Sequence, residues 1–249
     1  MKKNKYFFEK FNGLILLNKE NNISSNNLLK EIRLFFKSNI IGYSGTLDVL
    51  AKGLLVCFVG KALKFSKFIL NSNKSYYLDI KFGIDTDSSD PNGNIISSAP
   101  LNFFGIKGYN LKNILIRFIN KYKQLVPIYS SIKKKGKCVY KYSRLGVNVY
   151  IEYKNIRFNE IKLVSISKNR MSAKFNIICS KGSYIRNFVK DIGCYLGCGS
   201  YISELVRTEI GPFILSDAIK LNNLKNKNKM FKSLIPINLL PSDILSLLF

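Results

Sequence analysis

Two periodicities in the polar and apolar positions predict the first elements of the fold. In the segment 24–36 the apolar residues fall three or four apart, which is typical of an amphipathic helix with Ser24 or Ser25 as its N-cap. In the segment 76–82 every second residue is apolar, as in a strand with one buried face. The run LLVCFVG at 54–60 is an unbroken apolar stretch and predicts a buried strand.

Similar patterns in the rest of the chain complete a mixed set of elements. They predict helices at 61–70, at 111–122 with Asn110 as the cap and at 184–197 with Ser183 as the cap, a strand at 173–180, a turn-rich loop at 83–94, and a segment at 234–249 packed on the domain surface. Helices and several strands in one chain indicate an α+β (mixed α/β) sheet domain.

Arg186 occupies an unusual place in the helix predicted at 184–197. It would lie in the first turn, where the helix dipole disfavours a cation by about 0.3–1 kcal/mol. Two interpretations follow: Arg186 meets an anion, or its side chain extends into solvent at little cost.

The net charge and the missing histidine restrict the function. The 249-residue chain has 40 Lys and Arg against 15 Asp and Glu, a formal charge of +25, which indicates a polyanionic partner, either nucleic acid or an anionic membrane surface. The alternative is codon bias, since the chain is also crowded with Asn and Ile. The absence of His excludes Ser-His-Asp and Cys-His catalysis and any His-ligated metal.

The cysteines and the N-terminal region predict a cytoplasmic protein. The five cysteines are odd in number and scattered in spacing, so we expect free thiols packed as small apolar groups and no zinc site. The basic N-terminal segment has an uninterrupted apolar run only at 14–17, too short for a signal peptide. No apolar run reaches the roughly 18–20 residues that span a bilayer.

A segment at 122–150 interleaves cations with tyrosines, a composition suited to phosphates and stacked bases. The alternative is an ordinary solvated basic hairpin. A second distinctive stretch, GYSGTLDVLAKGLL at 42–55, is glycine-rich and then apolar, with Asp48 as its one carboxylate. Asp48 is either a buried catalytic group or the N-cap of a short helix.

Six stretches in chain order resemble motifs of the TruB-type tRNA pseudouridine synthases. They begin near residue 14 and end near 213, and they read LLNKENNISSNNLLKEIR, GYSGTLDVLAKGLL, KSYYLDIKFGIDTDSSDPNG, QLVPIYSSIKKKGKCVYKYSRLG, CSKGSYIRNFVKDIGCYLGCG and LVRTEIGPF. The resemblance implies the pseudouridine synthase fold, a long mixed and mostly antiparallel central sheet flanked by helices. It also implies conversion of uridine 55 in the T arm of tRNA to pseudouridine, without metal or organic cofactor.

The resemblance assigns roles to individual residues. By position in the motifs, Asp48 is the catalytic carboxylate, Tyr76 lies on the target base and Arg186 faces Asp48. Asp48 would either add as a nucleophile or remove the C2′ proton of the ribose, and the sequence leaves both open. The remaining residues matched to the nucleotide site are Lys19, which supports the active-site loops, Tyr43, Tyr184 and Leu205.

The basic segment corresponds to the thumb of the family, an RNA-binding insertion at about 122–150. Its cations are expected to contact the RNA backbone: Lys133, Lys134, Lys135, Lys137, Lys141 and Arg144. We expect a catalytic domain at 1–221, a short extension at 222–249 without the PUA domain of bacterial relatives, and a monomer that binds no metal and no membrane.

The sequence departs from the family motifs near the expected site. Tyr43 stands where the family has His, Glu20 and Val49 stand where it has Pro, and Lys52 replaces Thr. These changes leave room for a competing hypothesis, a protein that binds or folds tRNA with reduced or no activity. A third reading is a pseudouridine synthase that acts on another RNA.

Overall fold

The chain forms two compact units in the computed structural model, which describes residues 12–38, 40–99, 108–127, 133–134, 137–138, 152–167 and 171–245. The terminal unit contains Met1–Ser75 and Val206–Phe249, and the central unit contains Tyr76–Leu205. The predicted boundary at residue 221 stays a prediction.

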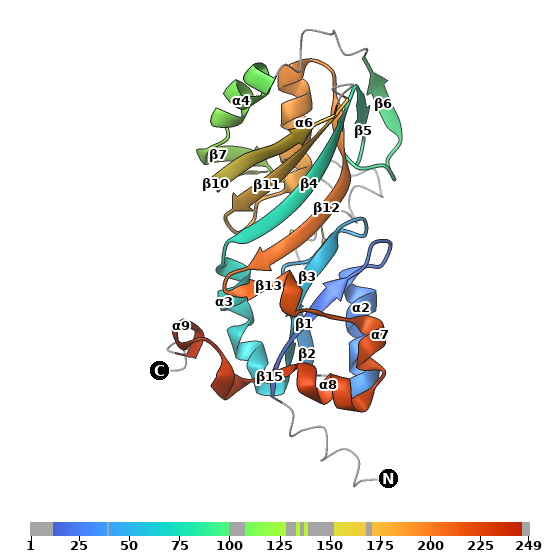
Figure 1. The fold of residues 1–249 in the computed structure, drawn as a ribbon, viewed down its shortest axis with the longest axis vertical. Helices are drawn as coiled ribbons and strands as arrows, with labels where there is room; N and C mark the ends of the chain where they lie inside the picture. The colour runs from blue at the N-terminus through green and yellow to red at the C-terminus, as the bar shows by residue number, and fades with distance from the viewer. Residues whose placement is uncertain are drawn as a thin grey trace. The chain divides into compact units, whose positions relative to one another are not determined.

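The terminal unit is built on a sheet with the strand order β14-β1-β3-β12 (Figure 1). Its strands are β1 (Gly13–Lys19), β2 (Ile41–Ser44), β3 (Lys52–Val59), the last part of β12 (Ser200–Ile210), β13 (Phe213–Ile214), β14 (Ile219–Lys220) and β15 (Leu234–Pro236). β1 pairs antiparallel with β3 along its whole length, and β3 pairs parallel with β12. Nearly every residue of β1 and β3 is buried, so the prediction of a buried strand at 54–60 is confirmed.

The described helices of the terminal unit include the one predicted at 24–36. They are α2 (Ser25–Phe36), η1 (Gly60–Phe65), α3 (Ser66–Asn71), η2 (Leu215–Asp217), α7 (Leu221–Leu224), α8 (Lys227–Ser233), η3 (Ile237–Leu239) and α9 (Ser242–Leu245). Ser24 caps α2, because its hydroxyl accepts from the backbone N–H of Asn27 at 3.1 Å. The single helix predicted at 61–70 is a 3₁₀ turn followed by a short α-helix.

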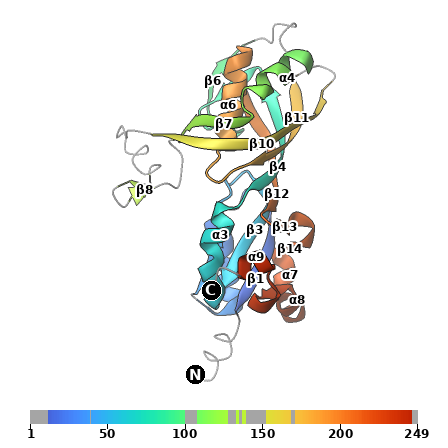
Figure 2. The ribbon, with the colours of Figure 1, turned by 90° about the vertical axis from the view of Figure 1, so that its left-hand side faces the viewer.

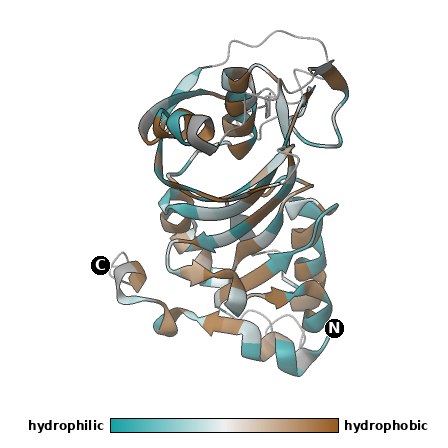
Figure 3. Ribbon diagram, turned by 45° about the horizontal axis from the view of Figure 1, so that its top comes forward, coloured by the Kyte–Doolittle hydropathy of each residue, from teal (hydrophilic) through white to brown (hydrophobic). Residues whose placement is uncertain are grey.

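The hydrophobic core of the terminal unit joins distant parts of the sequence. Leu14, Phe58 and Ile69 belong to one cluster with Leu240 and Ile244 near the C-terminus. Hydrophobic residues lie on both strands and helices of the fold (Figure 3). The segment predicted to lie on the domain surface is therefore anchored more deeply than expected, with Ile244 fully buried.

The central unit contains the rest of the mixed sheet, in the order β12-β4-β11-β10-β7 (Figures 1 and 2). Its elements are β4 (Lys74–Phe82), β5 (Ile84–Thr86), β6 (Ile95–Ser98), α4 (Gly108–Ile116), β7 (Asn120–Leu125), β8 (Lys133–Lys134), β9 (Lys137–Cys138), β10 (Tyr153–Ile166), β11 (Ser172–Cys179) and α6 (Ile185–Leu196). The alternation predicted at 76–82 is confirmed, since buried and half-buried residues alternate along β4. Most described pairings are antiparallel, so the predicted fold class is correct.

Three boundaries in the central unit differ from the predictions. The predicted loop at 83–94 contains strand β5 and the turn that leads to its partner strand β6. α4 begins at Gly108, so Asn110 lies within the helix and is not its cap. α4 also ends at Ile116, and β7 follows, because Phe118 packs in an aromatic cluster with Tyr122 and Phe188 and not on a continued helix. Phe118 and Tyr122 are four residues apart, which is also a helical spacing, so the sequence pattern does not show where α4 ends.

Candidate active site

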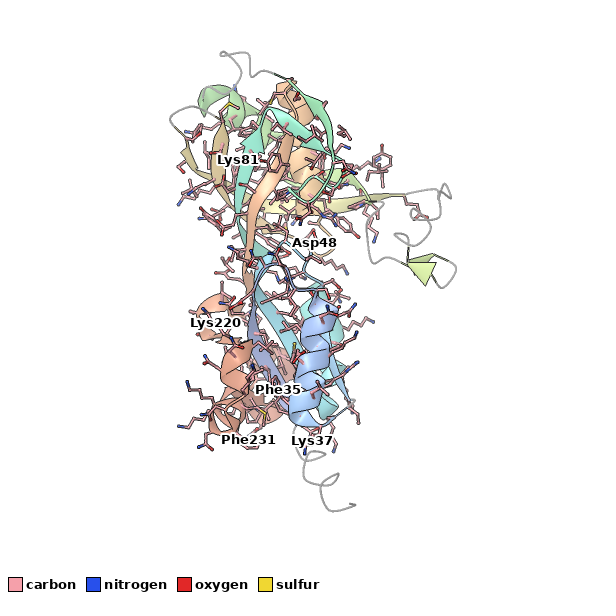
Figure 4. All side chains as sticks on the ribbon, turned by 90° about the vertical axis from the view of Figure 1, so that its right-hand side faces the viewer. Phe35, Lys37, Asp48, Lys81, Lys220 and Phe231 are labelled. Carbon is pink, nitrogen blue, oxygen red and sulfur yellow. The ribbon has the colours of Figure 1, made fainter. Side chains whose placement is uncertain are left out.

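Asp48 lies in the connection between β2 and β3, where Gly45–Ala51 forms an irregular loop, here called the Asp48 loop. In Figure 4 Asp48 lies at the N-terminal end of α2, and Lys37 marks the opposite end. The Asp48 side chain is half-buried. No helix begins in this described stretch, so the interpretation of Asp48 as a helix cap is wrong.

Arg207 of β12 holds both ends of the Asp48 loop. Its Nη2 donates to the carbonyl of Gly45 at 2.8 Å, and its Nε donates to the carbonyl of Leu54 at 2.8 Å. The side chain is 1% exposed, so both bonds are made away from water. These contacts fix the backbone before and after Asp48.

Lys19, at the end of β1, holds the middle of the same loop. Its Nζ donates to the carbonyls of Glu20 at 2.9 Å, Ile23 at 2.7 Å and Val49 at 3.3 Å. The side chain is fully buried, and burial lowers the pKa of Lys19 to about 8, although the Asp48 carboxylate raises it. Lys19 and Asp48 therefore lie within electrostatic reach of one another.

The first turn of α2 and the turn before it also bind the Asp48 loop. The hydroxyl of Ser25 donates to the carbonyl of Leu47 and accepts from its N–H, both at 3.0 Å. The N–H of Asn22 donates to the carbonyl of Val49 at 2.9 Å. Together with Arg207 and Lys19, these bonds satisfy backbone groups of a loop that has no regular secondary structure.

Tyr43 lies in β2, two residues before the loop. Its hydroxyl donates to Oδ1 of Asn26 in the first turn of α2 at 2.8 Å. The hydroxyl proton of Tyr43 is thus used in a hydrogen bond to Asn26, within the terminal unit. The Tyr43 side chain is half-buried, so part of it is exposed.

Arg186 and Tyr184 lie at the start of α6 in the central unit. Tyr184 is the N-cap residue and Arg186 is the second helical residue, so its predicted place in the first turn is confirmed. The prediction of Ser183 as the cap is wrong, because its hydroxyl donates to the carbonyl of Ser180 at 2.9 Å. The turn before the helix uses that hydroxyl instead.

Gln124 of β7 fixes this helix start. Its Nε2 donates to the carbonyl of Tyr184 at 2.9 Å, and its Oε1 accepts from the N–H of Tyr184 at 2.8 Å. Gln124 is 1% exposed, so its buried amide binds both the N–H and the carbonyl of one residue, Tyr184. The backbone is therefore fixed two residues before Arg186.

A tyrosine and a carboxylate make a second connection from β7 to α6. The hydroxyl of Tyr122 donates to Oδ2 of Asp191. Burial raises the pKa of both groups above their usual ranges, and the hydrogen bond to Asp191 raises that of Tyr122 further. This pair connects β7 to the middle of α6, whereas Gln124 binds the start of the helix.

Tyr76 and Leu205 come from neighbouring strands of the central unit, β4 and β12. Both are buried, at 8% and 6% exposure. Tyr76 points to the buried face of β4, on which Leu78 and Ile80 also lie. A buried aromatic ring with a polar tip suits the wall of a base pocket.

Of the cations predicted to contact the RNA backbone, three lie on described backbone. Lys133 and Lys134 form β8, which pairs antiparallel with Lys137 and Cys138 of β9. Lys135, Lys141 and Arg144 lie outside the described residues. The predicted basic segment therefore contains a hairpin, and its contact with RNA stays a prediction.

The described residues contain neither a candidate metal site nor a candidate membrane-spanning helix. No group of three or more His, Cys, Asp or Glu side chains there could hold a metal ion. The carboxylates of Asp87 and Asp90 accept hydrogen bonds within their own hairpin, from the N–H groups of Asn94 and Asn92. None of the described helices is long and apolar enough to cross a membrane.

Sequence reasoning assigned no role to Arg207 and Gln124, although both lie inside the quoted motifs. The signal for Arg207 is its place in β12, two residues after Leu205 and on the same buried face. A cation at an inward strand position must be hydrogen-bonded. Gln124 gives no comparable signal, because its partner Tyr184 lies 60 residues away.

The mixed sheet with its flanking helices is a pseudouridine synthase fold. Its likeness to solved structures is clear: a crystal structure of a Cbf5–Nop10–Gar1 complex has a TM-score of 0.69 and 20% identity, covering 93% of this chain and 61% of that chain. The structure of an H/ACA RNP bound to a substrate RNA containing 2′-deoxyuridine has a TM-score of 0.65 and 19% identity, covering 96% and 60%.

Sequence comparison defines the family. Residues 33–185 match the N-terminal domain of the TruB family pseudouridylate synthases, and residues 186–244 match the tRNA pseudouridylate synthase B C-terminal domain. The tRNA pseudouridine synthase B of Bordetella avium (strain 197N) is 37% identical over 94% of this chain and 95% of its own length. That of Francisella tularensis subsp. tularensis (strain WY96-3418) is 39% identical over 91% and 73%. The chain belongs to the TruB family of pseudouridylate synthases.

Proposed function

We propose that the chain isomerises uridine 55 in the T arm of tRNA to pseudouridine, with Asp48 as its catalytic carboxylate. The observation that carries the proposal is the Asp48 loop: Arg207, Lys19 and Ser25 hold its backbone around one half-buried carboxylate. The relatives named tRNA pseudouridine synthase B support the substrate class. We also propose that the protein is a monomer and acts in the cytoplasm.

The reaction breaks the bond between C1′ of the ribose and N1 of uracil, turns the base, and joins C1′ to C5. N1 takes up a proton, and the proton on C5 is lost to solvent. Asp48 can begin this either by adding to the nucleotide or by removing the C2′ proton. Deuterium at C2′ slows the second route and leaves the first unchanged.

The other proposed residues act on the same nucleotide. Arg186 is proposed to act as the charged partner of the Asp48 carboxylate. Tyr76 stacks on the target base, and Tyr184 and Leu205 line its pocket. The base leaves the folded T loop at a cost of a few kcal/mol, which contacts to the RNA backbone offset.

The proposed substrate is tested with isolated RNA hairpins. Transcripts of the T arm and of the anticodon arm, labelled with tritium at C5 of uridine, are incubated with the protein. We expect tritium release from the T arm and none from the anticodon arm. Tight binding of the T arm without release would favour a tRNA-binding or tRNA-folding protein. Release from the anticodon arm alone would favour another RNA target.

Binding of tRNA is expected to weaken steeply with salt. Six phosphate contacts from the thumb cations give a slope of about −4 to −5 in log affinity against log salt, a roughly 10²- to 10³-fold loss between 50 and 200 mM. The Kd is measured by filter binding at four salt concentrations. A constant Kd over this range contradicts the electrostatic account.

The matched comparison removes three charges in each of two places. The variant with Lys133, Lys135 and Lys141 changed to Ala is expected to flatten the slope by about 2 to 3. The variant with Lys225, Lys229 and Lys232 changed to Ala removes exposed charges of the C-terminal region and keeps the wild-type slope.

Lys19 predicts a pH dependence in which activity and stability move in opposite directions. Its pKa of about 8 in the fold is lower than the usual value near 10.4, so unfolding takes up a proton between these values. The contribution of Lys19 to the free energy of unfolding therefore rises with pH across this window. Activity falls there, by about fivefold, because neutral Lys19 holds Val49 less strongly.

The rate is measured from pH 7 to 9.5 together with the melting temperature. Lys19→Met keeps the apolar stem and removes the titrating group, so its rate is expected to be low and flat above pH 7.5. Lys61→Arg, at an exposed lysine of η1, keeps the wild-type profile. An unchanged fall near pH 8 in Lys19→Met assigns the titration to another group.

A further inference from the structure

Arg207 is a buried cation whose two described hydrogen bonds both go to backbone carbonyls. Its side chain is 1% exposed, and the carbonyls of Gly45 and Leu54 accept from two different nitrogen atoms of the guanidinium group. Burying a cation is unfavourable unless its donors are satisfied. Because burying a cation in a strand is unfavourable, packing alone does not explain an arginine at this position.

The two carbonyls lie on either side of Asp48. Gly45 begins the Asp48 loop, and Leu54 is the third residue of β3, which follows it. Nε and Nη2 are fixed relative to one another in the planar fork, so the guanidinium sets the separation between the two ends. A lysine at this position has a carbon in place of Nε and cannot make the bond to Leu54.

The backbone on both sides of the loop is shaped around Arg207. Gly45 has φ of 72°, and a Cβ there would lie 3.2 Å from Nη1 of Arg207. Gly53 has φ of 101°, and a Cβ there would lie 2.3 Å from the carbonyl oxygen of Arg207. Glycine is favoured at 45 beside the guanidinium group, and at 53 beside the backbone of Arg207, a contact that does not depend on the arginine side chain.

Arg207 also belongs to the charges around Asp48. The pKa of Lys19 is lowered chiefly by burial, is raised by the Asp48 carboxylate, and is lowered again by Arg207. Arg207 is therefore a second cation, beside Lys19, in the group of charges around Asp48.

We propose that Arg207 is a positioning residue of the active site, whose guanidinium group sets the conformation of the Asp48 loop and thereby the place of the Asp48 carboxylate. The inference rests on the proposed function, since it gives Arg207 a role only if Asp48 is catalytic. Arg207 touches no substrate in this account, so its loss should lower kcat and leave KM for tRNA unchanged.

Two variants disturb this contact from opposite sides. Arg207→Lys removes the fork, and Gly45→Ala places a methyl group against it. Both are expected to lower kcat by roughly 10- to 100-fold, as a misplaced catalytic group does, with KM within twofold of wild type. Hydrogen exchange of the amides at 45–51 is expected to be at least tenfold faster in both variants.

Each variant has a matched control. Ile210→Val removes a buried methylene from the same strand, and its melting temperature reports the effect of lower stability alone. Gly197→Ala tests the strain of a positive φ, because Gly197 has φ of 69° and open space around it. Both controls are expected to keep kcat and the exchange rates at 45–51.

The outcomes separate this inference from the proposed function. Wild-type kcat and wild-type exchange at 45–51 in Arg207→Lys overturn the inference, and so does an equal loss of kcat in Ile210→Val. An inactive wild-type protein contradicts the proposed function instead, and faster exchange at 45–51 in Arg207→Lys then still supports control of the loop by Arg207. If Arg207→Lys does not fold, Gly45→Ala decides by the same criteria.

Discussion

Replacement of Asp48 by Asn is expected to abolish pseudouridine formation and leave the protein folded and able to bind tRNA. Asn has nearly the same shape but can neither act as a nucleophile nor accept a proton, so the rate should fall by about 10⁴-fold or more. The loop is held through its backbone by Arg207, Lys19 and Ser25, and these bonds do not involve the Asp48 side chain. Loss of activity therefore does not require loss of structure.

The rate is measured by tritium release under single-turnover conditions, and binding by a filter assay. Asp217→Asn serves as the control, since it makes the same chemical change at an exposed position of η2 in the same unit. We expect wild-type rates for this control. Substantial activity in Asp48→Asn would remove Asp48 from the mechanism.

Replacement of Arg186 by Gln is expected to reduce the rate by about 10²- to 10³-fold, the loss that follows removal of one charge-stabilising group at an active site. The same change should leave stability unchanged or raise it slightly. Arg186 is the second residue of α6, where the helix dipole disfavours a cation by about 0.3–1 kcal/mol. A residue that costs stability and supports activity is expected at a functional site.

The comparison requires the melting temperature and the rate of each variant. Arg186→Lys keeps the charge but loses the planar fork, so it should recover only part of the rate. Arg157→Gln removes an exposed arginine of β10 and is expected to change neither quantity. A melting temperature that falls in step with the rate would make Arg186 a structural residue.

The sequence predicted the elements whose pattern is local. α2, β3 and β4 follow from spacing within single segments, and Ser24 follows from capping chemistry. The end of α4 was missed because Phe118 keeps helical spacing while it packs beyond the helix. Local patterns do not report on such tertiary contacts.

The candidate site was predicted unevenly for the same reason. Asp48 stands out in the sequence because it is the lone carboxylate of a glycine-rich stretch. Arg186 stands out because it is a cation in the first turn of a helix, where the helix dipole disfavours it. The supporting residues Arg207 and Gln124 bond to backbone groups far away in the chain. Backbone carbonyls and N–H groups carry no sequence signature, so only the fold identifies these contacts.

The most direct test is a position-resolved map of pseudouridine in a full-length unmodified tRNA. The transcript is incubated with wild-type protein or with Asp48→Asn, and every uridine is examined. We expect pseudouridine at position 55 with the wild-type protein, at no other position, and none with the variant. An unmodified uridine 55 with the wild-type protein, or modification at 55 by Asp48→Asn, would contradict the account.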